Sequence, residues 1–246
     1  MKARRAMALT LGLCFLLILG TAPGWGVEKP SLKELKEAAA ANPQDAQAKY
    51  MLGLKYAILG QQKEAMKAFK EALRLKPDYA EAFYARGSVK SEMGETEDAI
   101  KDYREALRLK KEFPEARQAL GTAYGELGVK LVKGKDWSGA AESFRQAIQI
   151  NPKDDGSFNN LGVALGNQNQ WGEAMESFRE AVRLNPNNIN ARYNLGVTAL
   201  RLGDKMTALQ QYEALGILDY NSAGQLFFFI SNPRGRDPGE MPIFKY

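Results

Sequence analysis

The sequence predicts an all-α protein built from repeated pairs of helices, and three recurring features carry this prediction. Small residues return at a nearly constant interval, since Ala65, Ala99, Ala140, Ala174 and Ala208 are separated by 34, 41, 34 and 34 residues. An aromatic residue follows each alanine four positions later, which is about one helical turn. A glycine precedes each alanine, at Gly53, Gly87, Gly121, Gly162 and Gly196. Such a period predicts a solenoid in which each helix pair packs only on its neighbours.

Residues 155–188 are the clearest copy of this unit, with the sequence DGSFNNLGVALGNQNQWGEAMESFREAVRLNPNN. They show two amphipathic segments, with small residues at the expected helix contact and with Leu161 and Phe178 filling the space around it. Pro186 ends the second segment because its ring cannot continue a helix. The chain resembles the tetratricopeptide repeat family in these positions over roughly residues 31–222. That resemblance implies a right-handed superhelical solenoid of antiparallel helix pairs, with a concave groove lined by the first helix of each pair.

The first 26 residues predict a signal peptide. MKARR is basic, residues 6–19 are apolar, and residues 20–26 supply small residues and a proline. Cleavage is expected after Gly24 or Gly26. If the apolar stretch is counted through Ala22, it becomes long enough for an uncleaved membrane anchor, which is the alternative. The sequence therefore predicts an exported protein, periplasmic or secreted, with attachment to the inner membrane as the other reading.

The repeats then follow in order. Residues 31–45 are expected to form a half-repeat helix with Ser31 and Glu34 in a capping box. Full repeats are expected at 46–79, 80–113, 114–154, 155–188 and 189–222. The turn within each pair requires a left-handed residue, which Gly60, Gly94 and Gly203 supply, with Asn169 as the next best residue.

The third repeat is seven residues longer than the others. We expect the segment GELGVKLVKGKDWSG to lengthen its first helix by about two turns and to move the turn outward. This extension is either a length variant without a role or a protruding edge that a partner contacts.

The periodicity stops after residue 222. Residues 223–230 are strongly apolar and predict a capping helix over the last repeat, because the end of a solenoid must be covered. The alternative is self-association through Phe227, Phe228 and Phe229. Residues 231–246 are rich in proline, glycine and charge, and their composition predicts disorder.

The composition excludes most catalytic chemistry. The chain has no histidine, and its single cysteine, Cys14, lies in the predicted leader. Ser-His-Asp catalysis, histidine metal ligands and thiol chemistry are therefore ruled out for the mature chain, and we expect no cofactor, no metal and no enzymatic activity. A glycosidase using Glu92 and Glu126 is the remaining enzymatic alternative. The net charge of +5 falls to +2 without the leader, which is too small to indicate nucleic acid as a partner.

The repeat resemblance also implies which residues face the groove, and it predicts a protein or peptide partner. The carboxylate clamp of chaperone-tail-binding relatives is absent, because its lysine positions hold Tyr50 and Tyr84, so an acidic C-terminal tail is not the expected ligand. Asn160 and Asn194 are 34 residues apart and resemble two rungs of the asparagine ladder in O-GlcNAc transferase repeats, with Met51, Ala85 and Ala119 at the earlier positions. An amide can donate to and accept from a peptide backbone, although asparagine is also an ordinary surface residue there. The expected groove residues are Tyr50, Leu54, Tyr84, Gln118, Asn159, Asn160, Asn167, Asn190, Tyr193, Asn194 and Arg201.

Overall fold

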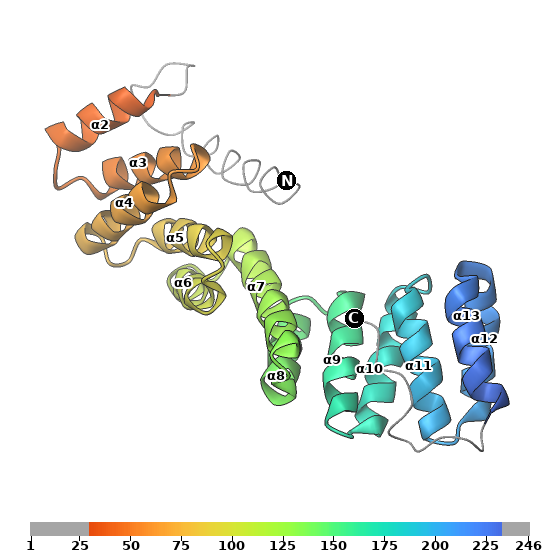
Figure 1. Cartoon of the computed structure of the whole chain (residues 1–246). Helices are drawn as coiled ribbons and strands as arrows, with labels where there is room; N and C mark the ends of the chain where they lie inside the picture. Colours follow the sequence, from red (N-terminus) through yellow and green to blue (C-terminus); the bar gives the residue numbers. More distant parts are fainter. Residues whose placement is uncertain (1–29, 233–246) are drawn as a thin grey trace. The chain divides into compact units, whose positions relative to one another are not determined.

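The structure, a computed structural model, describes residues 30–232 (Figure 1). The predicted leader and nearly all of the predicted disordered tail lie outside this range. Within it the chain forms twelve α-helices and no strand. Their bounds are α2 Leu32–Ala41, α3 Ala46–Ile58, α4 Gln62–Leu75, α5 Ala80–Glu92, α6 Thr96–Leu109, α7 Pro114–Lys133, α8 Trp137–Ile150, α9 Asp155–Asn167, α10 Trp171–Leu184, α11 Ile189–Arg201, α12 Lys205–Leu218 and α13 Tyr220–Ser231.

The chain divides into two compact units, and the division falls inside α7, between Leu120 and Gly121. The described part of the first unit holds α2 to α6 and the start of α7. The second unit holds the rest of α7 and the helices up to α13. In both units, consecutive helices pack as pairs, as the repeat pattern predicts.

In four of the five pairs, a glycine of the first helix packs directly on the aromatic residue of the second. A Cβ atom placed on Gly53 would lie 2.6 Å from the ring of Phe69, and one on Gly162 would lie 2.6 Å from the ring of Phe178. Gly87 has the same relation to Tyr103, at 2.9 Å. The first helix therefore approaches the aromatic ring of the second so closely that no side chain fits between them.

The turns within the pairs adopt the left-handed conformation that the sequence predicts. Gly60, Gly94 and Gly203 have φ of 72°, 80° and 80°, and Asn169 has φ of 62°. In the third repeat this position holds Lys135, with φ of 61°. All five residues stand nine positions before the aromatic residue of their second helix.

The third repeat is lengthened at a different place from the one predicted. α7 has 20 residues where the other first helices have 13, so the longer helix is confirmed. However, the turn at Lys135 keeps its usual distance from Phe144, and a Cβ atom on Gly128 would lie 2.6 Å from that ring. Gly128, and not Gly121, is therefore the glycine that pairs with the aromatic residue. The seven extra residues, 114–120, precede the paired part of the helix.

Short helices cover both ends of the repeat array. The predicted capping box forms at the start of α2, where Ser31 N–H donates to Glu34 Oε2 at 2.7 Å and Glu34 N–H donates to Ser31 Oγ at 3.2 Å. At the other end, α13 begins at Tyr220, three residues before the predicted position. Its Leu226 side chain is fully buried and lies 2.5 Å from a Cβ atom built on Gly196, the place that an aromatic ring of the second helix takes in the other pairs.

Between residues 30 and 232, no helix combines the length and the apolarity that crossing a membrane requires.

Candidate functional site

The register of the third repeat decides which residues share a face in the second unit. Counted from the glycine that meets the aromatic ring, Glu126, Asn160 and Asn194 occupy the same position of α7, α9 and α11, each 34 residues from the next. The prediction that Ala119 is the third-repeat equivalent of Asn160 is therefore wrong. The polar series has three members instead of two, and its first member is a carboxylate.

A cleft of about 550 Å³ opens between α7 and α9 on this face. The residues without a polar side chain that line it are Gly121, Gly125, Gly156, Val129 and Phe144. A Cβ atom at Gly125 would lie 3.9 Å from Ser157 Oγ, so a larger residue there would narrow the cleft, whereas one at Gly121 would meet Ile150 of α8 at 3.0 Å. The polar groups around it are Thr122, Glu126, Lys130, Lys133, Asp154, Ser157 and Asn160.

Asparagine side chains form a hydrogen-bonded chain that ends at this cleft. Asn194 Nδ2 donates to Asn159 Oδ1 at 2.9 Å, and Asn159 Nδ2 donates to Asn160 Oδ1 at 3.2 Å. Asn194 and Asn159 are buried, whereas Asn160 is half-buried and lines the cleft. With its oxygen accepting from Asn159, the amide nitrogen of Asn160 is the part of the side chain left to donate toward the cleft.

Capping interactions fix the first turns of α9 and α11, and so they position these asparagines. Asp154 accepts from the N–H of Ser157 at 3.3 Å and from its hydroxyl at 2.6 Å. Asn188 caps α11 by accepting from the N–H of Ala191 at 2.9 Å, and it donates to Asp155 Oδ2 at 2.8 Å. Because Asp155 begins α9, this last bond ties the starts of the two helices together.

Three of the predicted groove residues lie in the core of the first unit. Tyr50 packs against Phe69 and Tyr79, with ring centroids 6.0 and 4.9 Å apart, and Leu54 is fully buried. Tyr84 packs in the same way against two aromatic rings, those of Tyr103 and Phe113. The expectation that these side chains line an open groove is corrected, because they fill the space between successive repeats instead.

Gln118 and the polar residues at the helix ends are placed differently. Gln118 is exposed, but it belongs to the seven extra residues of α7 and not to the paired part. Asn167 is exposed and donates to Val163 O of its own helix at 2.8 Å. Arg201 lies with its guanidinium 4.4 Å from the ring centroid of Trp171, and burial lowers its pKa. Asn190 is half-buried in the first turn of α11.

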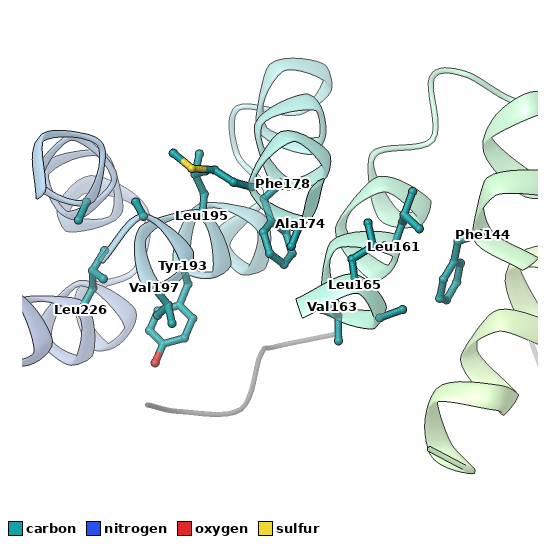
Figure 2. Close-up of a cluster of buried hydrophobic side chains, with 14 of the residues drawn as sticks. Phe144, Leu161, Val163, Leu165, Ala174, Phe178, Tyr193, Leu195, Val197 and Leu226 are labelled. Carbon is teal, nitrogen blue, oxygen red and sulfur yellow. The ribbon is translucent and has the colours of Figure 1, made fainter. Parts of the chain in front are cut away.

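One stretch of α9 and one of α11 are buried without interruption. Residues 193–199 of α11 are all buried, as are residues 161–166 of α9 (Figure 2). These residues include Tyr193, whose pKa burial raises to about 12. Six consecutive helical residues point in every direction around the helix axis, so both helices are covered on all sides at this level. Asn159, Asn194 and Tyr193 are therefore not on an open surface, and peptide binding by any of the predicted residues stays a prediction.

Within the residues that the structure describes, no three acidic, histidine or cysteine side chains are grouped closely enough to hold a metal ion.

Comparison with known proteins shows the same architecture. No curated protein sequence matches the chain. Among solved structures, it is similar to YrrB, described as a TPR protein with an unusual peptide-binding site, with a TM-score of 0.55 and 24% identity over 80% of this chain and 100% of that one. It is similar to MamA AMB-1 with a TM-score of 0.52 and 19% identity, over 71% of this chain and 92% of that one. The Naa15/Naa10 complex bound to HypK-THB gives a TM-score of 0.55 at 19% identity, over 82% of this chain and 31% of that one.

Family models agree with this architecture and extend over more than half of the chain. A TPR repeat model matches residues 53–94, 90–128 and 167–203, and a tetratricopeptide repeat model matches residues 143–176. The matches cover helix pairs of both units, including part of the third repeat. With its helix pairs, its glycine–aromatic contacts and its left-handed turns, the chain belongs to the tetratricopeptide repeat family.

Proposed function

We propose that this protein is a non-catalytic scaffold that holds an extended segment of a partner protein on the face that Glu126 and Asn160 form at the cleft between α7 and α9. The observation that carries the proposal is this cleft, which Glu126 and Asn160 line from equivalent positions one repeat apart, with Asn160 held from behind by the buried Asn159 and Asn194. The fold that the chain shares with protein-interaction scaffolds supports it.

The chemistry of the face suits a peptide backbone. An extended segment exposes a carbonyl and an N–H at every residue, and these groups need partners when they leave water. Asn160 is oriented by Asn159 so that its amide nitrogen can donate to a backbone carbonyl. Beside it, the apolar wall formed by Gly125, Val129 and Phe144 can accept one apolar side chain of the partner.

The similarity to YrrB points in the same direction. That protein is described as having an unusual peptide-binding site, and it shares this fold over its whole length. The likeness concerns the fold, so the residues that bind in this chain are assigned from its own cleft and not from YrrB.

The proposed location is the cell envelope, and its support is the N-terminal sequence. A basic start followed by an apolar stretch and small residues is the layout of a signal peptide. The alternative is an assembly factor attached to the inner membrane by an uncleaved leader, with the same binding face. Mass spectrometry of the intact mature protein separates the two, because loss of the first 24 or 26 residues leaves no anchor, whereas a full-length chain contradicts cleavage.

Crosslinked capture from the native envelope tests the binding face. The tagged full-length protein is compared with Asn160→Ala and with Asn187→Ala, a matched control in the exposed loop between α10 and α11. We expect one partner to be enriched by the wild type and the control, and to fall at least about tenfold with Asn160→Ala, which corresponds to the roughly 1.4 kcal/mol of one lost polar contact. Equal capture by all three proteins would contradict the assignment of partner binding to this face.

A further inference from the structure

One position of the first helices has no side chain in the third repeat, and it lies at the cleft. Counted three residues back from Gly53, Gly87, Gly128, Gly162 and Gly196, this position holds in turn Tyr50, Tyr84, Gly125, Asn159 and Tyr193. The three tyrosines and the asparagine are buried, so each of them fills space in its own repeat. In the third repeat the position is a glycine, which lines the cleft.

In the first unit, the tyrosine at this position is held between two other aromatic rings. Tyr50 of α3 packs on Phe69, the aromatic residue of its own pair, with ring centroids 6.0 Å apart. It also packs on Tyr79 at the start of α5, with centroids 4.9 Å apart. Tyr84 has the two equivalent aromatic neighbours, at 5.9 and 5.1 Å. A ring at this position therefore fills the space between one first helix and the next.

In the third repeat, two of these three rings are missing. Gly125 stands in place of the tyrosine, and Asp154 is the N-cap of α9, where Tyr79 is the N-cap of α5. The third ring, that of Phe144, is present and lines the cleft. A Cβ atom on Gly125 would lie 3.9 Å from Ser157 Oγ, which is an ordinary contact distance and leaves room for a side chain. The cleft is therefore the place of an absent aromatic ring, with one aromatic neighbour of that ring still in position.

We infer that the cleft binds an aromatic side chain of the partner protein, which takes the place that tyrosine rings occupy in the first unit. This inference rests on the proposed function, because it names the type of residue that the same cleft recognises. The bound ring should lie beside Phe144 as Tyr50 lies beside Phe69, with centroids 6.0 Å apart, which is within the range of favourable aromatic pairs.

The size and the charges of the cleft agree with such an occupant. Its volume of about 550 Å³ is that of a ligand pocket and can hold a ring together with the backbone on either side of it. The charged side chains that line it are two carboxylates, of Glu126 and Asp154, and two ammonium groups, of Lys130 and Lys133. Because the two signs are equal in number, the cleft favours neither an acidic nor a basic side chain, and a neutral ring fits it. The amide nitrogen of Asn160 can then donate to the backbone beside the ring.

Two ligands with the same backbone test the inference. N-acetyl-tyrosine amide and N-acetyl-leucine amide are titrated separately into the full-length protein, and binding is followed by saturation-transfer difference NMR. We expect the tyrosine derivative to bind with a Kd on the order of millimolar. The leucine derivative should bind about fivefold more weakly, because it cannot form an aromatic pair with Phe144. Equal binding of the two ligands, or no binding of the tyrosine derivative, would overturn the inference.

A substitution at Gly125 assigns the binding to the cleft. Gly125→Tyr supplies the ring from the chain itself, so it should abolish binding of the tyrosine derivative. It should also melt at a higher temperature than Gly125→Ala, which gains helix propensity without the ring. Gly172→Tyr is the matched control, because a Cβ atom at this exposed position of α10 would meet nothing within 4 Å, and it should leave binding unchanged.

The outcomes with these variants decide the assignment. If Gly125→Tyr fails to fold by circular dichroism, Gly125→Leu takes its place in the binding test, since its side chain also occupies the cleft. Unchanged binding by a folded variant of Gly125 would overturn the inference. A folded Gly125→Tyr protein that melts below Gly125→Ala would also overturn it, because the cleft would then not accept a ring.

The proposed function can fail or stand separately. In the capture experiment, Gly125→Tyr should lose the partner as Asn160→Ala does, whereas Gly172→Tyr should retain it. Capture that depends on Asn160 without selective binding of the tyrosine derivative leaves the scaffold function standing and overturns the aromatic site. Selective binding that Gly125→Tyr abolishes, together with capture that does not depend on Asn160, supports the aromatic site and contradicts the proposed role of Asn160 in holding the partner.

Discussion

At the scale of single residues, the second repeat contains a buried group of charges that the other repeats lack. Asp102 accepts from Arg86 Nε at 2.8 Å and from Arg86 Nη2 at 2.7 Å, and it lies 2.8 Å from Lys90 Nζ. The side chain of Asp102 is 5% exposed, and those of Arg86 and Lys90 are 18% and 15% exposed. At the position of Arg86, counted from the paired glycine, the other repeats have leucine: Leu52, Leu127, Leu161 and Leu195.

We predict that Asp102→Ala destabilises the protein strongly, whereas replacing the whole group does not. Removing the carboxylate alone leaves two cations without a counterion in a largely buried position, which costs about 3–5 kcal/mol of unfolding free energy. The triple variant Arg86→Leu, Lys90→Leu, Asp102→Ala restores the apolar pattern of the other repeats and should differ from the wild type by less than about 1 kcal/mol. Urea denaturation followed by circular dichroism measures both. A triple variant as unstable as Asp102→Ala would contradict this account.

Tyr193 predicts a change of stability at alkaline pH. Burial raises the pKa of this phenol from 10.0 to about 12 in the folded protein. Its contribution to stability is therefore fully present below pH 10 and is lost as the pH rises from about 10 to 12, because the unfolded chain releases the proton first. We expect the melting temperature of Tyr193→Phe to fall less than that of the wild type across this range.

The control for that experiment is Tyr220→Phe, since Tyr220 is 85% exposed at the start of α13. Its melting temperature should follow the wild type at every pH. A decline of Tyr193→Phe between pH 10 and 12 as steep as that of the wild type would show that this phenol is not the group responsible.

At the scale of helices, the sequence predicted most of the fold because the signals lie within one repeat. The glycine and the aromatic residue of the fourth repeat, Gly162 and Phe178, meet as expected, and the turn residues have the expected positive φ. The prediction for the third repeat was wrong because its register was counted forward from Pro114. The register is determined by the packing on Phe144, so it has to be counted back from that residue. Counting back would have placed Gly128 against the ring and Lys135 in the turn.

The glycine–aromatic contact gives a prediction with a matched control. A Cβ atom at Gly162 would lie 2.6 Å from Cε1 of Phe178, whereas one at Gly172 would meet nothing within 4 Å. Gly162→Ala should therefore lower the unfolding free energy by about 1–3 kcal/mol through overpacking. Gly172→Ala, in the first turn of α10, should raise it by about 0.5–1 kcal/mol because alanine restricts the unfolded chain.

Thermal and urea unfolding of the two variants check this prediction. The double variant Gly162→Ala, Phe178→Leu serves as a second control, since a smaller side chain opposite the new methyl group should recover part of the loss. Equal effects of Gly162→Ala and Gly172→Ala would mean that the close approach of α9 and α10 does not limit stability.

At the scale of the whole molecule, the candidate site was harder to predict than the fold. The hydrogen-bonded chain from Asn194 through Asn159 to Asn160 depends on contacts between repeats, and no spacing within one repeat reveals it. Glu126 was recognisable in principle, because it stands 34 residues before Asn160, but only once the register of α7 is known. The burial of Tyr50 and Tyr84 in aromatic contacts between repeats likewise follows from neighbouring repeats and not from their own.

The last repeat leaves an apolar surface that predicts self-association. α13 is apolar on two sides: Leu226 is buried against α11, whereas Phe227 and Phe228 are 49% and 51% exposed on the other side. Tyr212 of α12 extends this surface, with its ring centroid 5.2 Å from that of Phe227. An exposed apolar surface at the end of a repeat array favours contact with an identical surface on a second copy, because a two-fold axis lets one patch serve both subunits.

We predict that the protein forms a concentration-dependent dimer through this surface, measurable by size-exclusion chromatography with light scattering. The double variant Phe227→Ser, Phe228→Ser should remain monomeric at concentrations where the wild type is dimeric, with little change in melting temperature, since both rings are half exposed. Leu226→Ala is the matched control on the same helix: it should lower the unfolding free energy by about 2–5 kcal/mol, because its side chain fills the space at Gly196. The prediction is contradicted if the wild type stays monomeric at high concentration or if the dimer persists after the serine substitutions. Either result would mean that the exposed rings have no role in assembly.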